Sequence, residues 1–213
     1  MEAGLLEALL APAQPLLASA FTLWGSAVTW LEGVAFVLSL AMVAANMRVN
    51  AVGWPLAIAA SLLYSLLFAQ SRLYGEASLQ LFFVAVSFWG WWQWLRATGD
   101  DGAPLAVHRL ARAQVIRAAL ATFAAWPLLG LLLRHMTDSD VPFLDALPTV
   151  GSITGQFLLG RKLVENWLVW LLVNLFSVGL FAFKGLWLTV LLYALFAVLS
   201  LVGWRAWNRM ARG

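Results

Sequence analysis

The chain has no cysteine and only two histidines among its 213 residues. The absence of cysteine excludes disulfides and thiol chemistry, although it carries no information about the compartment. Both histidines, His108 and His135, fall in polar connections between apolar runs. A histidine-based metal or catalytic site therefore has little material, and we expect neither a metal nor a cofactor.

Charged residues are also scarce, at 11% of the chain against 63% hydrophobic residues, and the mean hydropathy is +0.85. A soluble domain carries about 25% charged residues. There is too little polar surface to cover a water-exposed globule, so the composition predicts an integral membrane protein. The net charge is only +3, and the basic residues stand between apolar runs, which suits membrane topology better than nucleic-acid binding.

Enzyme signatures are absent as well. The sequence contains no acids paired on one helix face, no HExxH, no GxSxG and no phosphate-binding loop. The glycine-rich run Gly151–Gly155 lies inside an apolar segment, where small residues let helices approach closely. We expect no enzymatic activity and no catalytic residue.

What the chain has in abundance is apolar runs of membrane-spanning length, separated by polar breaks. Seven of them predict spans at roughly 31–47, 53–70, 76–96, 113–134, 144–160, 164–183 and 186–206. The leading segment 1–30 is apolar but broken by Pro12, Pro15 and Gly25, and without a basic start it does not resemble a signal peptide. We expect a helix there, lying at the interface or packed on the bundle, with an extra span as the alternative.

The basic residues set the predicted orientation. With seven spans, ten of the thirteen fall on one side: Arg48, Arg96, Arg109, Arg112, Arg117, Arg161, Lys162, Arg205, Arg209 and Arg212. The other side receives Arg72, Arg134 and Lys184. The positive-inside rule then predicts a cytoplasmic carboxyl terminus.

An internal repeat relates the two halves of the chain. Residues 32–94 align without a gap with residues 145–207, at an offset of 113 positions and with fifteen identical pairs in 63 positions. The pairs include Arg48 with Arg161, Trp54 with Trp167, and Trp94 with Trp207. Each copy holds three spans, and the run 113–134 adds a single crossing between them.

Two three-span copies joined by an odd number of crossings must share one orientation. The sequence therefore predicts an all-α membrane protein with a 3+1+3 plan. The expected parts are the N-terminal helical segment 1–30, a first three-helix unit 31–96, a linker with its helix 97–135, and a second unit with the carboxyl terminus 136–213. Repeats of this kind place a substrate site at their interface, an argument by analogy.

The segment 165–184 is the most informative of the apolar runs. On a helix, Trp167, Trp170, Asn174 and Ser177 fall on one stripe, at i, i+3, i+7 and i+10. An amide in hydrocarbon is costly unless it faces protein, water or a ligand. Two indoles and an amide could grip a flat polar molecule, and contacts between helices are the alternative explanation.

Corresponding positions of the repeat offer different polar groups, as expected if two scaffold copies enclose an asymmetric ligand. Ser61 corresponds to Asn174, Tyr64 to Ser177, and Gln80 to Tyr193. Together with Trp167 and Trp170, these six residues form the candidate substrate site of eight residues. The alternatives for Gln80 and Tyr193 are a backbone hydrogen bond and a place in the headgroup belt, respectively.

Three further patterns concern the ends of the spans. The segments 90–94 and 203–207, rich in tryptophan, are typical of an interfacial aromatic belt. Arg161, Lys162 and Glu165 suggest a short inner loop with charges paired near the headgroups. No carboxylate lies deep in a span, since Glu76 and Glu165 are near ends, which favours passive movement over proton coupling.

At these residues the chain resembles the PnuC family of bacterial vitamin-precursor transporters, best known for nicotinamide riboside. The resemblance covers about 32–207, and it departs from the family pattern at Gly53 and Ala57. Its second half rests on Pro142-Phe143-Leu144-Asp145, Arg161-Lys162, Glu165-Asn166-Trp167, Trp170 with Asn174, Ser177 and Lys184-Gly185. Its looser first half rests on Trp54-Pro55, Tyr64, Phe68, Leu73-Tyr74, Leu79-Gln80 and Gly90-Trp91.

The resemblance implies a fold like that of the SWEET sugar transporters, a bacterial inner-membrane location and a homotrimer. It also implies facilitated diffusion of nicotinamide riboside, made one-way by a cytosolic kinase that phosphorylates the arriving nucleoside. Relatives that carry thiamine or riboflavin, which are also flat heteroaromatics, are the alternative.

Overall fold

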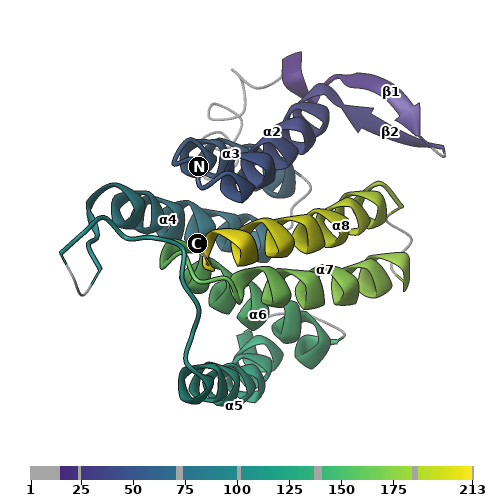
Figure 1. The fold of residues 1–213 in the computed structure, drawn as a ribbon. Coiled ribbons are helices and arrows are strands. Elements are labelled where there is room, and N and C mark those ends of the chain that lie inside the picture. The colour runs from purple at the N-terminus through teal and green to yellow at the C-terminus, as the bar shows by residue number, and fades with distance from the viewer. Residues whose placement is uncertain are drawn as a thin grey trace. The chain divides into compact units, whose positions relative to one another are not determined.

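The computed structural model describes residues 15–23, 25–70, 74–99, 102–136, 141–183 and 187–212. Within these ranges the chain is mostly helical, and each of its seven helices lies within a few residues of a predicted span (Figure 1). The helices are α2 (Trp30–Met47), α3 (Gly53–Gln70), α4 (Tyr74–Arg96), α5 (Arg112–Met136), α6 (Pro142–Gly160), α7 (Asn166–Phe183) and α8 (Trp187–Met210). The turns predicted to carry Arg72 and Lys184 lie outside the described residues.

Four segments in the described part of the chain are long and apolar enough to cross a membrane. They are α2, α3, α5 and residues Val190–Met210 of α8, while Asn166–Leu180 of α7 is a shorter apolar helix. Large apolar side chains cover the outside of α5, among them Leu120, Phe123 and Leu128. Such a surface is stable against lipid rather than water, which confirms the prediction of a membrane protein.

Residues 19–23 and 26–29 pair as an antiparallel β-hairpin, so the helix expected in this part of 1–30 is wrong. Strand β1 (Ser19–Leu23) pairs with β2 (Ser26–Thr29). Gly25 in the turn has a positive φ of 84°, a conformation that glycine adopts without strain. Aromatic and β-branched residues such as Phe21 and Val28 favour strands locally, which explains why this apolar segment forms strands and not a helix. Residues 1–14 lie outside the described part of the chain.

The hairpin leads directly into α2 through a helix cap. The Thr29 hydroxyl oxygen accepts a hydrogen bond from the Glu32 backbone N–H at 3.1 Å. Thr29 is therefore the N-cap residue, and the spacing Thr-x-x-Glu is that of a capping box. The cap fixes the start of the first apolar span at Trp30.

The chain divides into two compact units. Unit 1 consists of Met1–Met42 and Val52–Phe88, and unit 2 of Val43–Ala51 and Trp89–Gly213. Within unit 1, the Ser65 hydroxyl of α3 donates a hydrogen bond to the Ala77 carbonyl of α4 at 3.0 Å. The division into repeats at 31–96, 97–135 and 136–213 stays a prediction, because compactness and internal repetition are different properties.

Unit 2 is built from helices packed in chain order, α5 on α6, α6 on α7 and α7 on α8 (Figure 1). Small residues make the close contacts between them. A side-chain carbon placed on Gly151 would come within 2.6 Å of Val173, and one on Gly203 within 2.6 Å of the Trp167 ring. The prediction that the glycines of 151–155 serve helix contact is confirmed.

Candidate functional site

The predicted stripe on α7 is buried on its polar side. Trp167 and Asn174 are each 3% exposed, Ser177 is buried as well, and Trp170 is half-buried. The face opposite carries apolar residues that are open to the surroundings, such as Leu172 at 67% exposure. Asn174 therefore faces protein, as the cost of an amide in hydrocarbon requires.

Asn174 is held by the neighbouring helix α8. Its side-chain NH₂ donates to the Ser200 hydroxyl oxygen at 3.2 Å, and that hydroxyl donates in turn to the Phe196 carbonyl at 2.7 Å. This chain of bonds joins α7 to α8 and fixes the orientation of the Asn174 amide. A fixed amide is a better recognition group than a free one, because less rotational freedom is lost on binding.

Trp170 lies against α6, where Gly155 leaves space for its ring. An added Cβ on Gly155 would stand 3.0–3.3 Å from three atoms of the indole. The ring thus rests directly on the α6 backbone, and it can come this close because Gly155 has no side chain. Gln156, the next residue of α6, is buried at the same level of the helix.

Tyr193 belongs to the same unit, on α8. It is half-buried, and its ring meets Phe196 edge-on with 6.1 Å between centroids. Ser200 lies seven residues further along α8, so the two share a face of that helix. The structure thus brings Trp170, Asn174 and Ser177 of α7, together with polar groups of α6 and α8, into one unit.

The other three predicted residues lie in unit 1. Ser61 and Tyr64 are on α3 and Gln80 is on α4, and all three are half-buried. The Tyr64 ring stacks on Phe68, one turn along α3, with 6.1 Å between centroids. Their convergence with the α7 stripe stays a prediction.

Sequence reasoning missed Ser200 and Gln156 as members of the candidate site. Both are buried polar residues inside apolar helices, which is the signal that could have found them. Ser200 was visible as an identical pair of the repeat with Ser87, and Gln156 as the amide that follows the glycine run.

Two tryptophans expected in an interfacial belt, Trp94 and Trp207, are buried in unit 2 instead. The Trp94 indole N–H donates to the Leu159 carbonyl at 3.0 Å, and the Trp207 indole N–H donates to the Asn46 carbonyl at 3.1 Å. Their ring centroids are 6.1 Å apart. Trp92, by contrast, is 60% exposed and fits the belt. The belt interpretation is wrong for the two buried rings because their N–H groups find carbonyls at helix ends.

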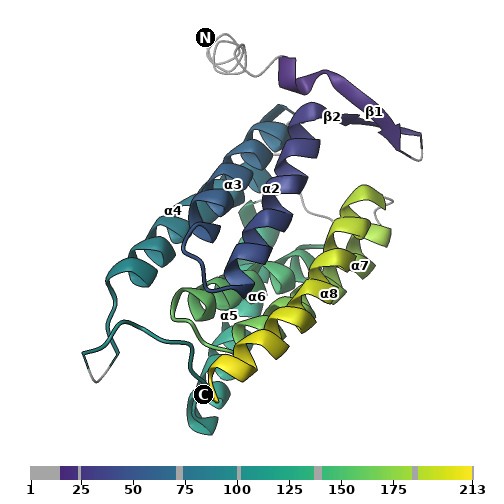
Figure 2. The same ribbon diagram turned by 45° about the horizontal axis from the view of Figure 1, so that its top comes forward.

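We call this part of unit 2 the tryptophan end, defined by Asn46, Trp94, Leu159, Asn166, Trp167 and Trp207. Here α2, α4, α6 and α8 finish and α7 begins. The segment between α4 and α5 passes over the end of α8, where Arg109 donates a hydrogen bond to the Asn208 side chain (Figure 2).

The loop between α6 and α7 closes the tryptophan end with a buried lysine. The Lys162 ammonium donates to the Leu105 carbonyl at 2.8 Å and lies 5.2 Å from the centre of the Trp94 ring. Burial lowers the pKa of this ammonium. Glu165 accepts a hydrogen bond from the Leu110 backbone N–H at 3.1 Å. Lys162 and Glu165 thus each bind a backbone group of the segment between α4 and α5, although the sequence predicted that the charges of this loop would pair.

Indoles, amides and hydroxyls make up the site, and these groups recognise rather than react. They can stack on a flat ring and exchange hydrogen bonds with a polar ligand. Among the described residues no cluster of histidine, aspartate or glutamate could hold a metal ion.

Comparisons with known proteins agree on one family. Residues 29–209 match the family described as nicotinamide mononucleotide transporter. The chain is 27% identical over 212 residues to the nicotinamide riboside transporter PnuC of Escherichia coli, covering 88% of this chain and 89% of that protein. It is 30% identical over 194 residues to the riboflavin/roseoflavin transporter RibM of Streptomyces davaonensis, with the same coverage.

A solved structure supports the fold. The crystal structure of the vitamin B3 transporter PnuC matches with a TM-score of 0.72 and 21% identity, covering 98% of this chain and 88% of that one. Since the family match takes in nearly all of the described helices, this chain belongs to the nicotinamide mononucleotide transporter family, whose members are membrane transporters and not enzymes.

Proposed function

We propose that the chain transports nicotinamide riboside across a bacterial inner membrane. The observation that carries the proposal is the buried α7 face, where Trp170 rests on Gly155 and Asn174 is fixed by Ser200. Relatives in Escherichia coli and Neisseria mucosa, each 27% identical, are nicotinamide riboside transporters.

The chemistry of the ligand fits these groups. Nicotinamide riboside carries a flat pyridinium cation, and indole faces attract such a cation by about 0.5–2 kcal/mol each. Asn174, Tyr193 and Gln80 offer hydrogen bonds for its carboxamide and ribose hydroxyls. No arginine or lysine stands in α7 or in the described part of α8 before Arg205, so a phosphate would lack a counter-charge. The nucleoside rather than its phosphorylated form is therefore the proposed substrate.

The proposed architecture is SWEET-like, two parallel three-helix repeats joined by the single crossing α5. The reciprocal bonds of Trp94 and Trp207 support it. Trp94 and Trp207 are 113 positions apart, and so are their acceptors Asn46 and Leu159. Equivalent helix ends that meet at one end of unit 2 are what repeats of the same orientation would give, whereas inverted repeats would separate them.

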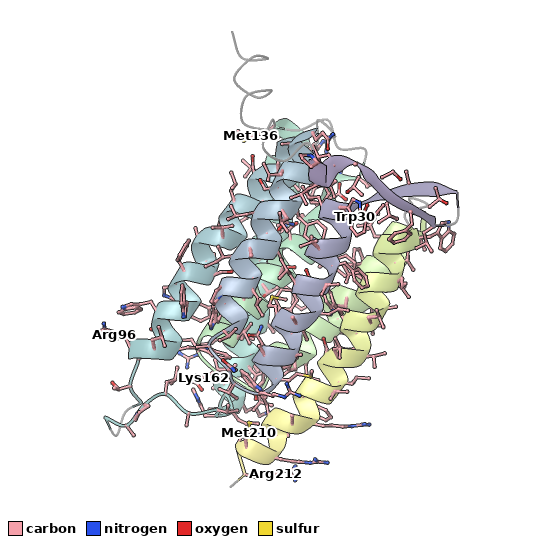
Figure 3. All side chains as sticks on the ribbon, turned by 90° about the horizontal axis from the view of Figure 1, so that it is seen from above. Trp30, Arg96, Met136, Lys162, Met210 and Arg212 are labelled. Carbon is pink, nitrogen blue, oxygen red and sulfur yellow. The ribbon has the colours of Figure 1, made fainter. Side chains whose placement is uncertain are left out.

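The proposed orientation puts the tryptophan end and the carboxyl terminus in the cytoplasm. Figure 3 shows Arg96, Lys162 and Arg212 at one end of unit 2, opposite Met136 at the end of α5. A basic end of this kind supports the cytoplasmic assignment under the positive-inside rule.

The proposed mechanism is facilitated diffusion, with uptake made one-way by phosphorylation of the nucleoside in the cytosol. The described part of α7 carries no charged side chain, and Glu165 lies before its first residue. A proton-coupled carrier would need such a group at depth. The proposed assembly is a homotrimer in the membrane.

Riboflavin is the second candidate, on a specific observation. The chain is 30% identical to a riboflavin/roseoflavin transporter, RibM, over 88% of its length. Thiamine, a flat cation like nicotinamide riboside, is the third ligand to compare.

Binding to the purified protein decides between these ligands. Nicotinamide riboside, thiamine and riboflavin are titrated separately, and binding is followed by quenching of tryptophan fluorescence. We expect nicotinamide riboside to bind tightest and nicotinamide mononucleotide to bind at least tenfold more weakly. Tighter binding of riboflavin or thiamine would replace the proposed substrate.

A further inference from the structure

Three buried polar atoms at the tryptophan end have no hydrogen-bond partner among the described residues. They are Asn46 Oδ1, Asn166 Oδ1 and Trp167 Nε1. Their side chains are 4%, 0% and 3% exposed, respectively. A buried polar group without a partner is costly, and in a native protein it calls for an explanation such as strain, a bound water or a functional role.

Contacts along the chain and between helices join the three residues that carry these atoms. The Asn46 carbonyl accepts from the Trp207 indole at 3.1 Å, and the Trp207 ring meets the Trp167 ring edge-on, with 5.6 Å between centroids. Asn166 precedes Trp167 in the chain. Its side-chain NH₂ already donates to the Leu163 carbonyl at 2.6 Å, so its oxygen is the part that remains unpaired.

One donor and two acceptors define the chemistry of a complementary ligand group. Such a group must supply two N–H or O–H donors and one acceptor. A primary carboxamide has this composition, and so does the pair of hydroxyls on a ribose. The three unpaired atoms are neutral dipoles. The Lys162 ammonium at the same end, which donates to the Leu105 carbonyl at 2.8 Å, disfavours a second cation, so the subsite suits an uncharged part of the ligand.

We infer that Asn46, Asn166 and Trp167 form a second subsite, which binds the carboxamide or the ribose hydroxyls of the substrate at the tryptophan end. Trp167 stands one turn before Trp170 on α7, so the subsite continues the stripe of the central site toward the proposed cytoplasmic side. The inference rests on the proposed function and adds a step to it, in which the substrate exchanges the central groups for this subsite before release.

Two substitutions test the subsite. Asn46→Leu removes one acceptor and keeps the branched shape of the side chain. Trp167→Phe removes the donor but keeps an aromatic ring against Gly203 and Trp207. We expect each variant to slow uptake of nicotinamide riboside into proteoliposomes at least fivefold. We expect Asn46→Leu to leave the equilibrium affinity within twofold of wild type and the melting temperature unchanged or higher, because an apolar side chain has no unpaired acceptor.

Thr149→Val serves as the matched control. The Thr149 hydroxyl is also in unit 2, but it donates to the Asp145 carbonyl of its own helix at 2.9 Å. This variant should transport and bind as the wild type does. A lower melting temperature of Asn46→Leu together with a wild-type uptake rate would show a structural role alone and overturn the subsite.

Nicotinic acid riboside separates the two ligand groups, because its carboxylate lacks the N–H donors of the carboxamide. If Asn46→Leu slows only nicotinamide riboside, the carboxamide occupies the subsite; equal slowing of both assigns it to the ribose hydroxyls. Wild-type uptake rates in both Asn46→Leu and Trp167→Phe overturn the inference and leave the proposed function intact. A wild-type protein that binds no nicotinamide riboside contradicts the proposed function and, with it, this ligand.

Discussion

Val49 and Lys162 stand 113 positions apart and share a left-handed backbone, with φ values of 54° and 52°. Among the described residues they are the two positions other than glycine with positive φ. The hydrogen bonds around them also correspond, from Val49 N–H to Asn46 O at 3.0 Å and from Lys162 N–H to Leu159 O at 2.9 Å. A β-branched residue rarely adopts this conformation, so the sequence repeat extends to an unusual turn that ends the first helix of each copy.

The first prediction concerns the reciprocal tryptophan bonds that lie beside these turns. Trp94→Phe and Trp207→Phe each keep an aromatic ring and remove the N–H, which leaves the Leu159 or the Asn46 carbonyl with one partner fewer. A buried acceptor that loses its partner costs about 1–3 kcal/mol. We expect both variants to lower the melting temperature in detergent by similar amounts.

Trp92→Phe is the matched control, since Trp92 is 60% exposed on the same helix as Trp94. It should melt as the wild type does. A large loss for one of the two buried tryptophans and none for the other would contradict the equivalence of the two contacts.

The second prediction concerns the central site. Trp170→Ala removes the indole face that rests on Gly155, and Asn174→Ala removes the amide fixed by Ser200. We expect each to weaken binding of nicotinamide riboside at least tenfold, because cation–π and amide contacts are lost together with the fixed geometry. Binding is measured by titration of the purified variants.

Leu172→Ala is the control for both, because Leu172 lies on the exposed side of the same helix. It should bind as the wild type does. If Trp170→Ala and Asn174→Ala also bind normally while remaining folded, the ligand is held elsewhere.

The helices of this protein could be predicted well because each obeys a local rule. Length, apolar composition and polar breaks place all seven within a few residues of the described helices. The strands 19–23 and 26–29 were not predicted, because apolar residues suit a strand as well as a helix. Only Gly25 and the β-branched residues favoured a hairpin. Apolar composition indicates that a segment avoids water, but it does not determine which secondary structure the segment adopts.

The buried stripe of α7 could be predicted along its helix, but its partners on other helices could not. The 3.6-residue period placed Trp167, Asn174 and Ser177 on one buried face, as the structure confirms. Ser200, which orients Asn174, lies on another helix, and no period within a single element reports such a partner. For the same reason the burial of Trp94 and Trp207 was missed, since their acceptors are 65 and 161 positions away in the chain.

The third prediction uses two glycines that differ in their surroundings. A Cβ on Gly203 would lie 2.6 Å from the Trp167 ring, whereas one on Gly179 would meet nothing within 4 Å. Gly203→Ala should therefore force the ring to move and destabilise the protein by about 1–3 kcal/mol. Gly179→Ala should be neutral or stabilise α7 by up to about 1 kcal/mol. Melting temperatures check both, and equal effects of the two substitutions would contradict the packing of α8 on Trp167.

The last prediction concerns pH and Lys162. Burial lowers the pKa of its ammonium in the folded protein below the ordinary value of 10.5. Between the lowered pKa and 10.5 the unfolded chain binds more protons than the folded one, so the contribution of this residue to stability rises with pH. Lys162→Met has no such titration. As the pH rises from 7 toward 10.5, the melting temperature of the wild type should rise relative to that of Lys162→Met.

The comparison with Lys162→Met cancels the general effect of alkaline pH on the rest of the protein. Arg161→Gln, a change at the exposed neighbouring residue, should keep the pH dependence of the wild type. A difference between wild type and Lys162→Met that stays constant or shrinks with rising pH would mean that the ammonium is not desolvated. Its contacts with Leu105 and the Trp94 ring would then lie in a hydrated loop, and the tryptophan end would be open to water rather than closed by the loop between α6 and α7.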